Sequence, residues 1–597
     1  MGLLLIGMLL TAYSAPAQTL FGGVMEDADI VREYVAPTRI MWLTEQSVSG
    51  ADNLLQPFNG QVSVTQKNCC VMSTKKGGSS AILLDFGREM HGALQIVSAI
   101  RDVQLPARFR IRMGESVTEA MSDVNTSNAT NDHAMRDFEL MVPWLGSVTT
   151  GNSGFRFVRI DLLSDSIEVP LATVRAVAQY RNLPYKGSFR CSDDRLNRIW
   201  QTGAYTVHQC MQEYVWDGIK RDRLVWIGDM HPEVMTINTV FGWHPVVAKS
   251  LDFARDDTPL GGGKTNNVNV AAYDDTFMDA LKAEPKWMNN MCSYSLWWIL
   301  IQRDLYLYQG KLDYLRQQHT YLSQLLRQVM NNTDGKKEKL DGGIRFLDWP
   351  TSEQTEVIHA GLQALTIMAL EAGAELLRAL DDTGMANEVE QKAKLMRKYV
   401  PAHQDNKQAT ALLSLAGMMK AAKSEAILTR NGAEGFSTFF GYYMLEALAR
   451  IGAYEEAMKL ISDYWGGMID LGATTFWEDF TYSDLARAGR IDQTVPEGKY
   501  DIHRDGGAYC YVGMRLSLCH GWASGPTAWL SRHVLGIEPL EAGCRKVRIV
   551  PHLGQLQWAE GTFPTPQGII SVKHVRNADG TVDSEIKAPE GIEVVRE

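Results

Sequence analysis

Residues 217–229 read Asp-Gly-Ile-Lys-Arg-Asp-Arg-Leu-Val-Trp-Ile-Gly-Asp and combine ionisable and aromatic side chains within thirteen positions. They contain three carboxylates, three cations and one tryptophan, interrupted by two glycines. Helix interiors avoid glycine, and exposed helix faces rarely carry large aromatic rings. We therefore predict an irregular segment between two helices, in which planar rings hold polar groups against a cavity.

Two further stretches place a carboxylate beside a tryptophan. Asp348 precedes Trp349, and Glu478 follows Trp477. Acid-base hydrolysis of a glycosidic bond needs a protonated carboxyl group and a second carboxylate across the bond. A separation of about 6.5–9.5 Å admits a water and inverts the product, whereas about 5–5.5 Å gives retention. The sequence supplies the carboxylates and leaves their separation open.

The overall composition is that of a large globular protein. The chain has 597 residues, 45% of them hydrophobic, and a net charge of -11. It lacks the clustered Lys and Arg that bind phosphate backbones, so we expect no nucleic-acid partner. The eight cysteines are scattered without a C-x-x-C pair, which predicts mostly buried free thiols, no metal site and no cofactor.

The N-terminal stretch resembles a targeting segment. An apolar run followed by Ala15-Pro16-Ala17 predicts a signal peptide over residues 1–18 and export to the periplasm or the medium. No later apolar run is expected to span a membrane.

Short alternating segments dominate residues 19–186 and predict a β-sandwich region. The expected strands are 61–65, 81–86, 93–97, 109–113, 155–160 and 173–177. The polar stretch 123–132 is expected to be a surface loop. Strand-like periodicity returns in a small C-terminal β domain over residues 537–597, at 546–551, 568–575 and 582–586.

Between these regions, residues 187–536 follow a helical period of about 3.6 residues. Besides a first helix near Ser192, helices are expected at 233–254, 292–309, 312–331, 352–379, 384–400, 408–420, 437–451, 454–469 and 522–535. Consecutive helix pairs of this kind build either a solenoid or a closed α/α toroid. No fixed repeat recurs, and long irregular inserts at 255–290 and 470–515 favour the toroid, whose loops gather at one end.

Residues 217–229 resemble the signature of glycoside hydrolase family 78, the α-L-rhamnosidases. In that family an Asp, then Arg-Glu, then Gly-Trp-x-Gly-Asp recur at this spacing. Residues 472–478 resemble its Trp-Glu motif, and residues 518–530 are similar to its closing His-containing helix. The resemblance implies a multidomain α+β fold: a central (α/α)6 toroid between an N-terminal β-sandwich region and a small C-terminal β-sandwich.

The resemblance also implies roles for individual residues. Asp222 occupies the general-acid position and Glu478 the general-base position. The sugar-binding side chains that it implies are Asp217, Arg221, Trp226, Asp229, Trp297, Trp298, Trp349 and His520, with one of the two adjacent tryptophans expected at the pocket wall.

Two positions depart from the family pattern. Val225 stands where the family has glycine, and Asp222 stands where it has glutamate, which is one methylene longer. Burial or a neighbouring carboxylate would raise the pKa of an aspartate and let it act as an acid. Asp217 and Asp229 would act in that direction, and the nearby arginines would oppose it.

The sequence predicts an exported exo-glycosidase that removes terminal α-L-rhamnosyl or related residues from a polysaccharide or other glycoside by inversion. Two alternatives stay open. One is another α/α-toroid hydrolase or a lyase acting on a uronic acid, which would release a product absorbing ultraviolet light. The other is a non-catalytic glycan-binding protein, which would bind oligosaccharide and release no sugar.

Overall fold

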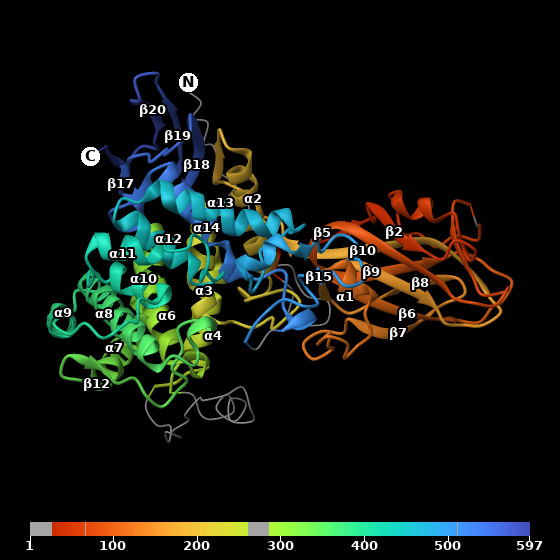
Figure 1. Ribbon diagram of the computed structural model, residues 1–597, viewed down its shortest axis with the longest axis horizontal. Coiled ribbons are helices and arrows are strands. Elements are labelled where there is room, and N and C mark those ends of the chain that lie inside the picture. The colour runs from red at the N-terminus through yellow and green to blue at the C-terminus, as the bar shows by residue number, and fades with distance from the viewer. Residues whose placement is uncertain (1–26, 66, 261–285, 510–511, 597) are drawn as a thin grey trace, which may run out of the picture.

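The computed structural model describes residues 27–65, 67–260, 286–509 and 512–596 of the chain. The predicted signal peptide, most of the insert at 255–290, and Cys510 lie outside the described residues. Figure 1 shows an N-terminal β domain on one side, a helical body, and a smaller C-terminal β domain packed on that body. The seven described cysteines are all free and buried, as expected.

The N-terminal β domain is a ten-stranded assembly organised around one long strand, β5. Its strands are β1 (Ile30–Val35), β2 (Arg39–Leu43), β3 (Val48–Ser49), β4 (Cys70–Ser73), β5 (Ser80–Ser98), β6 (Ala107–Gly114), β7 (Asp137–Val142), β8 (Gly146–Thr149), β9 (Ser153–Leu162) and β10 (Glu168–Arg181). β5 pairs with β9 over Ser80–Asp85 and Met90–Gly92, with β2 in its first half, and with β8 and β10 in its second half. The segments predicted as separate strands at 81–86 and 93–97 are thus parts of one continuous strand.

The prediction of a strand at 61–65 is wrong. These residues form an irregular, mostly exposed segment. Its polar side chains bond locally: Asn59 accepts from the backbone N–H of Gln61 at 2.9 Å, and the hydroxyls of Ser63 and Thr65 lie 3.1 Å apart. Such local bonds compete with strand pairing.

The helical body contains twelve α-helices among its described residues. They are α2 (Asp194–Cys210), α3 (Ile227–Val240), α4 (Pro245–Asp256), α6 (Cys292–Gln309), α7 (Leu312–Asn331), α8 (Thr355–Ala379), α9 (Thr383–Met396), α10 (Lys407–Leu415), α11 (Ala421–Leu428), α12 (Gly441–Arg450), α13 (Tyr454–Asp470) and α14 (Gly525–Trp529). Each helix of an inner set contacts the next one: α3 contacts α6, α6 contacts α8, α8 contacts α10, α10 contacts α12, and α12 contacts α14. Helix α14 in turn contacts α3. This inner ring closes, so the body is the predicted (α/α)6 toroid and not a solenoid.

Helix boundaries differ from the predictions where the backbone turns. The single helix expected at 233–254 is two helices, because Gly242 adopts a φ of 75° between α3 and α4. The helix expected at 522–535 begins with a 3-10 turn (Gly521–Ser524), continues as α14 and ends in a π turn (Leu530–Val534). Helix α11 was not predicted.

One described helix, α8, is long and apolar enough to cross a membrane, although no such run was expected after the leader. It is an inner helix of the toroid, and 83% of its most apolar window is buried inside the protein. Its composition therefore reflects a position in the core.

The C-terminal β domain contains two sheets. The larger has the order β11 (Ser188–Cys191), β18 (Trp558–Thr565), β19 (Gly568–Arg576) and β20 (Val582–Lys587); the smaller joins β16 (Ile537–Pro539), β17 (Lys546–Ile549) and β21 (Glu593–Val595). Strand β11 precedes the toroid in sequence and pairs with β18, which follows it. The toroid is thus held between two chain segments of one sheet.

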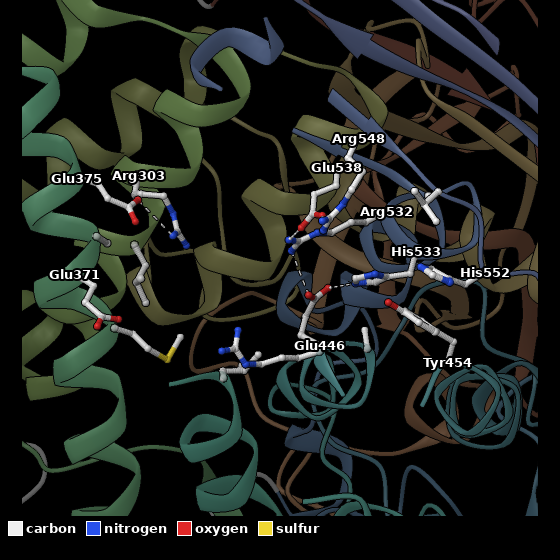
Figure 2. Close-up of a pocket in the computed structure, with 18 residues that line it drawn as sticks. Arg303, Glu371, Glu375, Glu446, Tyr454, Arg532, His533, Glu538, Arg548 and His552 are labelled. Atoms are coloured by element: carbon white, nitrogen blue, oxygen red, sulfur yellow. Dashed lines mark hydrogen bonds and ion pairs between the residues drawn. The ribbon is translucent and has the colours of Figure 1, made fainter. Parts of the chain in front are cut away.

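The C-terminal ends of the inner helices meet this small domain around a pocket of about 670 Å³, which Figure 2 shows. Its charged side chains are paired: Arg532 lies 3.1 Å from Glu446 and 2.5 Å from Glu538, and His533 lies 3.1 Å from Glu446. This end of the toroid is therefore lined by an ion-pair network.

Candidate active site

The predicted site residues gather at the opposite end of the toroid, where the inner helices begin. Asp229 and Tyr294 lie in the first turns of α3 and α6, and Asp348 lies just before α8. Gln408 lies in the first turn of α10, and His520 precedes the final 3-10 turn and α14. Since the inner helices all point the same way, their N-terminal ends bring these side chains to one end of the toroid.

Asp217 shapes the irregular segment that precedes α3. Its two carboxylate oxygens accept the backbone N–H groups of Asp222 at 2.8 Å and Leu224 at 2.9 Å. Its own carbonyl accepts from Gly521 at 2.6 Å. Burial, followed by the charge of Asp222, raises the pKa of Asp217 to about 8. The carboxyl group expected to bind sugar is thus also the group that folds the loop.

Glycine is required twice in this segment. A Cβ on Gly218 would lie 2.6 Å from the carbonyl oxygen of Arg221, and one on Gly228 would lie 2.3 Å from the ring of Tyr294. Both close approaches explain why glycines interrupt an otherwise charged sequence.

Asp222 is the more accessible of the two predicted catalytic carboxyl groups, with 11% of its side chain exposed. Its Oδ2 accepts from Trp226 Nε1 at 3.1 Å. Its Oδ1 lies 3.3 Å from Arg221 Nη2 and 3.3 Å from His133 Nε2. The departure from glutamate therefore comes with three side chains that fix the shorter carboxyl group.

Glu478 is buried and linked to His520. Its Oε2 accepts the backbone N–H of Ser517 at 3.0 Å, and its Oε1 lies 3.8 Å from His520 Nδ1. Burial raises the pKa of Glu478, while the charges of His520 and Arg221 act in the opposite direction. A carboxyl group with a raised pKa is a suitable proton acceptor near neutral pH.

Asp229 lies behind the imidazole of His520. Its oxygens lie 3.0 Å from His520 Nε2 and 3.0 Å from the hydroxyl of Tyr294. Burial raises the pKa of Asp229 to about 8. The structure thus joins Asp229, His520 and Glu478 in one chain of contacts.

The aromatic predictions divide into two pairs. Trp226, directly before α3, and Trp349, in the 3-10 turn before α8, are both half-buried. The ring of Trp349 lies 4.9 Å from the ring of Phe346. Trp297 and Trp298 are both fully buried, so neither forms an open wall. Trp297 stacks on Tyr443 at 4.6 Å.

Trp298, which was named among the sugar-binding residues as one of two candidates for the pocket wall, belongs instead to the core. Its Nε1 donates to the carbonyl of Leu251 in the outer helix α4, and its ring packs on Tyr321 in α7. Consecutive residues on a helix point about 100° apart, so the ring next to Trp297 turns outward.

The N-terminal β domain contributes residues that the sequence did not reveal. Lys220 is buried, and its Nζ lies 2.9 Å from Glu115 and 3.3 Å from Glu119. These two carboxyl groups and His503 are close enough together to hold a metal ion. The ammonium group of Lys220 already supplies the positive charge there.

His133 was missed as well. It follows the polar stretch 123–132, which was expected to be only a surface loop, and no local pattern marks its contact with Asp222. Only the long-range contact between the N-terminal β domain and the toroid identifies His133 as a site residue, and the sequence alone does not show that contact.

Two family models match the chain. The bacterial α-L-rhamnosidase six-hairpin glycosidase domain matches residues 184–534, and the bacterial α-L-rhamnosidase C-terminal domain matches residues 536–595. A curated α-L-rhamnosidase of Alteromonas sp. (strain LOR) is 23% identical over 558 residues, which are 85% of this chain and 55% of that protein. The chain thus spans about half the length of this relative.

Solved structures share the fold. The GH78 rhamnosidase of Bacillus sp. GL1 is 20% identical with a TM-score of 0.72, over 92% of this chain and 55% of that one. The Klebsiella oxytoca rhamnosidase with rhamnose bound is 18% identical with a TM-score of 0.63, over 84% and 96% of the two chains. With a family model that covers more than half of its residues, the chain belongs to the bacterial α-L-rhamnosidases, glycoside hydrolase family 78.

Proposed function

We propose that the protein is an exo-acting glycosidase that hydrolyses terminal α-L-rhamnosyl linkages in a polysaccharide or glycoside. Family membership supports the sugar and the reaction class. The observation that carries the proposal is the pairing, at the end of the toroid where the inner helices begin, of a partly accessible carboxyl group with a buried one. Asp222 and Glu478 are close enough for the charge of Asp222 to raise the pKa of Glu478.

In the proposed mechanism, Asp222 donates a proton to the glycosidic oxygen as the bond breaks. Glu478 removes a proton from the water that attacks the anomeric carbon from the other face, which inverts the configuration. His520 would keep Glu478 oriented, because its ring is fixed from behind by Asp229. The carboxylate that forms on Asp222 as it gives up its proton stabilises the positive charge that develops on the sugar.

Sugar recognition is assigned to the polar groups around this pair. The guanidinium of Arg221 donates to the carbonyl of Arg515 through Nη1, which helps to hold its Nη2 beside Asp222. Asp217, Asp229 and His520 would bind hydroxyl groups through their remaining hydrogen-bonding capacity. Trp226 and Trp349 offer half-buried ring edges for the apolar face of the sugar.

We also propose that the protein is exported. The apolar segment and Ala15-Pro16-Ala17 support removal of a signal peptide over residues 1–18. N-terminal sequencing of the protein from a secreting host tests this: a start near residue 18 supports export, and a retained Met1 contradicts it.

The decisive experiment is hydrolysis of an aryl α-L-rhamnoside with NMR detection of the first-formed anomer. Inversion is expected, and a retained configuration would contradict the assigned roles. Glu478→Gln and Asp222→Asn should each lower kcat by about 10²–10⁴ while binding persists. Glu390→Gln, an exposed residue paired with Arg378 and Lys394, is the matched control and should be fully active.

Other outcomes distinguish the alternatives. Full activity in Glu478→Gln would overturn the assignment of the base. An ultraviolet-absorbing product from a uronic-acid polymer would indicate a lyase, and tight oligosaccharide binding without released sugar would indicate a binding protein.

A further inference from the structure

His133 brings the N-terminal β domain into the active site. It lies between α1 (Val117–Met121) and β7, and its Nε2 is 3.3 Å from Oδ1 of Asp222. We infer that His133 is a positioning residue for Asp222 and returns a proton to this carboxyl group between turnovers. The inference rests on the proposed role of Asp222 as the general acid.

The loop that carries His133 is fixed from the toroid side. Arg223 donates to the backbone carbonyls of His133 and, at 3.2 Å, of Asn152. Arg515 lies 2.8 Å from the carboxylate of Asp132. Because the backbone of His133 and the side chain of Asp132 are both bound, the imidazole is held beside Asp222.

The chemistry of the contacts separates His133 from the other neighbours of Asp222. Arg221 and the indole of Trp226 can only donate hydrogen bonds, so neither can accept one from a carboxyl O–H. A ring nitrogen of neutral histidine can instead accept one. Among the side chains that contact this carboxyl group within the described part of the chain, His133 alone can thus accept a hydrogen bond from the protonated carboxyl that a general acid requires.

An inverting reaction also creates a need for proton return. Each turnover leaves Asp222 without its proton and Glu478 with one more. In the proposed step, protonated His133 passes the proton on Nε2 to Oδ1 of Asp222, and the neutral ring takes a proton from water. The side chain of His133 is 29% exposed against 11% for Asp222, so the imidazole is the more open of the two to solvent.

The charges around His133 come from both domains. Burial lowers its pKa; Asp222 and Asp132 raise it, and Arg221 and Arg515 lower it. Arg223 faces the loop backbone. With a lowered pKa, the ring is mainly neutral at neutral pH and takes up its proton more readily as the pH falls.

The test compares leaving groups. Phenyl α-L-rhamnoside needs acid assistance, whereas 2,4-dinitrophenyl α-L-rhamnoside has a leaving group that departs without it. His133→Gln and His133→Phe should lower kcat on the phenyl substrate by roughly 10-fold to 100-fold, with little change in KM. Activity on the dinitrophenyl substrate should be nearly unchanged, which also shows that the variants fold.

Two further measurements sharpen the result. Added imidazole should restore activity of His133→Ala on the phenyl substrate. The control is His319→Gln, which removes a histidine 3.2 Å from Asp382 on the outer helices and should behave as the parent protein.

Equal losses on both substrates would indicate a purely structural role and overturn the inference. Asp222→Asn separates this failure from that of the proposed function. If Asp222→Asn shows the leaving-group dependence and the His133 variants do not, the inference alone is wrong. If Asp222→Asn shows none, the assignment of the acid fails first.

Discussion

His520 Nε2 lies 3.0 Å from Oδ2 of Asp229, so the imidazole is oriented by a buried carboxyl group. The other ring nitrogen faces Glu478 at 3.8 Å. The same carboxyl group of Asp229 accepts from Tyr294 through its second oxygen. A residue implied by the family pattern to bind sugar therefore also orients the histidine that contacts the proposed base.

Removal of the Arg221 charge should move the acid limb of activity to higher pH. The guanidinium is one of two cationic groups that oppose the burial-driven rise in the pKa of Glu478. Without it, the carboxyl group stays protonated to higher pH and cannot act as a base there. The pH profile of kcat/KM for Arg221→Gln measures this shift. An acid limb at the parent position, or at lower pH, would contradict it; Arg487→Gln at the surface should leave the profile unchanged.

Gly228→Ala should damage the site from one methyl group. The new Cβ would lie 2.3 Å from the Tyr294 ring, which must move away from Asp229. Overpacking of this kind costs about 1–3 kcal/mol of stability. Thermal unfolding and kcat with an aryl rhamnoside should both decline. The control is Gly384→Ala in α9, where a new Cβ meets nothing within 4 Å; this variant should keep both the unfolding temperature and the kcat of the parent. Unchanged stability and kcat in Gly228→Ala would contradict the prediction, because they would show that the Tyr294 ring has room to shift.

Lys220→Met should leave two buried carboxyl groups without their shared cation. Loss of one partner from a buried ionic group costs about 3–5 kcal/mol. The folded-state pKa values of Glu115, already about 7, and of Glu119 should both rise. A carboxyl pKa above its unfolded value makes stability fall as the pH rises toward the folded pKa.

The deficit of Lys220→Met relative to the parent should therefore be larger at pH 8 than at pH 5. Thermal unfolding at both values measures it, and Lys459→Met, an exposed lysine paired with Asp463, is the control. A deficit that does not depend on pH would mean that these carboxyl groups do not titrate in this range.

Glu446→Gln should weaken the other end of the toroid. Burial alone would raise the pKa of Glu446, but His533 and Arg532 hold it below its ordinary value. Stability from a depressed carboxyl pKa is fully present above the unfolded value of about 4.3 and is lost as the pH falls through the folded one. The variant should thus be destabilised by about 3–5 kcal/mol at pH 7.

The difference in the free energy of unfolding between Glu446→Gln and the parent should become smaller toward pH 3, as measured by denaturant unfolding. A gap that stays constant would show that the charge of Glu446 contributes nothing. The control is Glu390→Gln, which changes a partly exposed residue and should have the parent's free energy of unfolding at each pH.

Local periodicity predicted most of the fold. Helices α6 and α7 begin and end at the predicted residues 292–309 and 312–331, because a helical stripe and a following glycine or turn define them. Predictions failed where tertiary context decides. The β-branched pattern at 61–65 found no partner strand, and Gly242 divided a helix whose pattern is continuous.

The site was predictable only as far as the three motifs extend, at residues 217–229, 472–478 and 518–530. The carboxyl groups of Asp217, Asp222 and Asp229 fall in a single segment, and the structure brings Glu478 to them across some 250 residues of chain. Neither His133 nor the partners of Lys220 could be read from the sequence, because their role depends on packing between domains. Trp298 shows a different limit: one of the two adjacent tryptophans was expected at the pocket wall, and only the structure shows that the ring of Trp298 faces the outer helices.

The contacts of Lys220 and His133 limit which N-terminal domains can be exchanged into this protein by recombination. A recombination event that replaced the first 186 codons with those of an unrelated β-sandwich would keep every residue of the signature motif. It would nevertheless leave Lys220 without its two carboxyl partners and Asp222 without its histidine neighbour. We therefore expect a chimera of this kind to regain the stability and activity of the parent only when it carries equivalents of Glu115, Glu119 and His133.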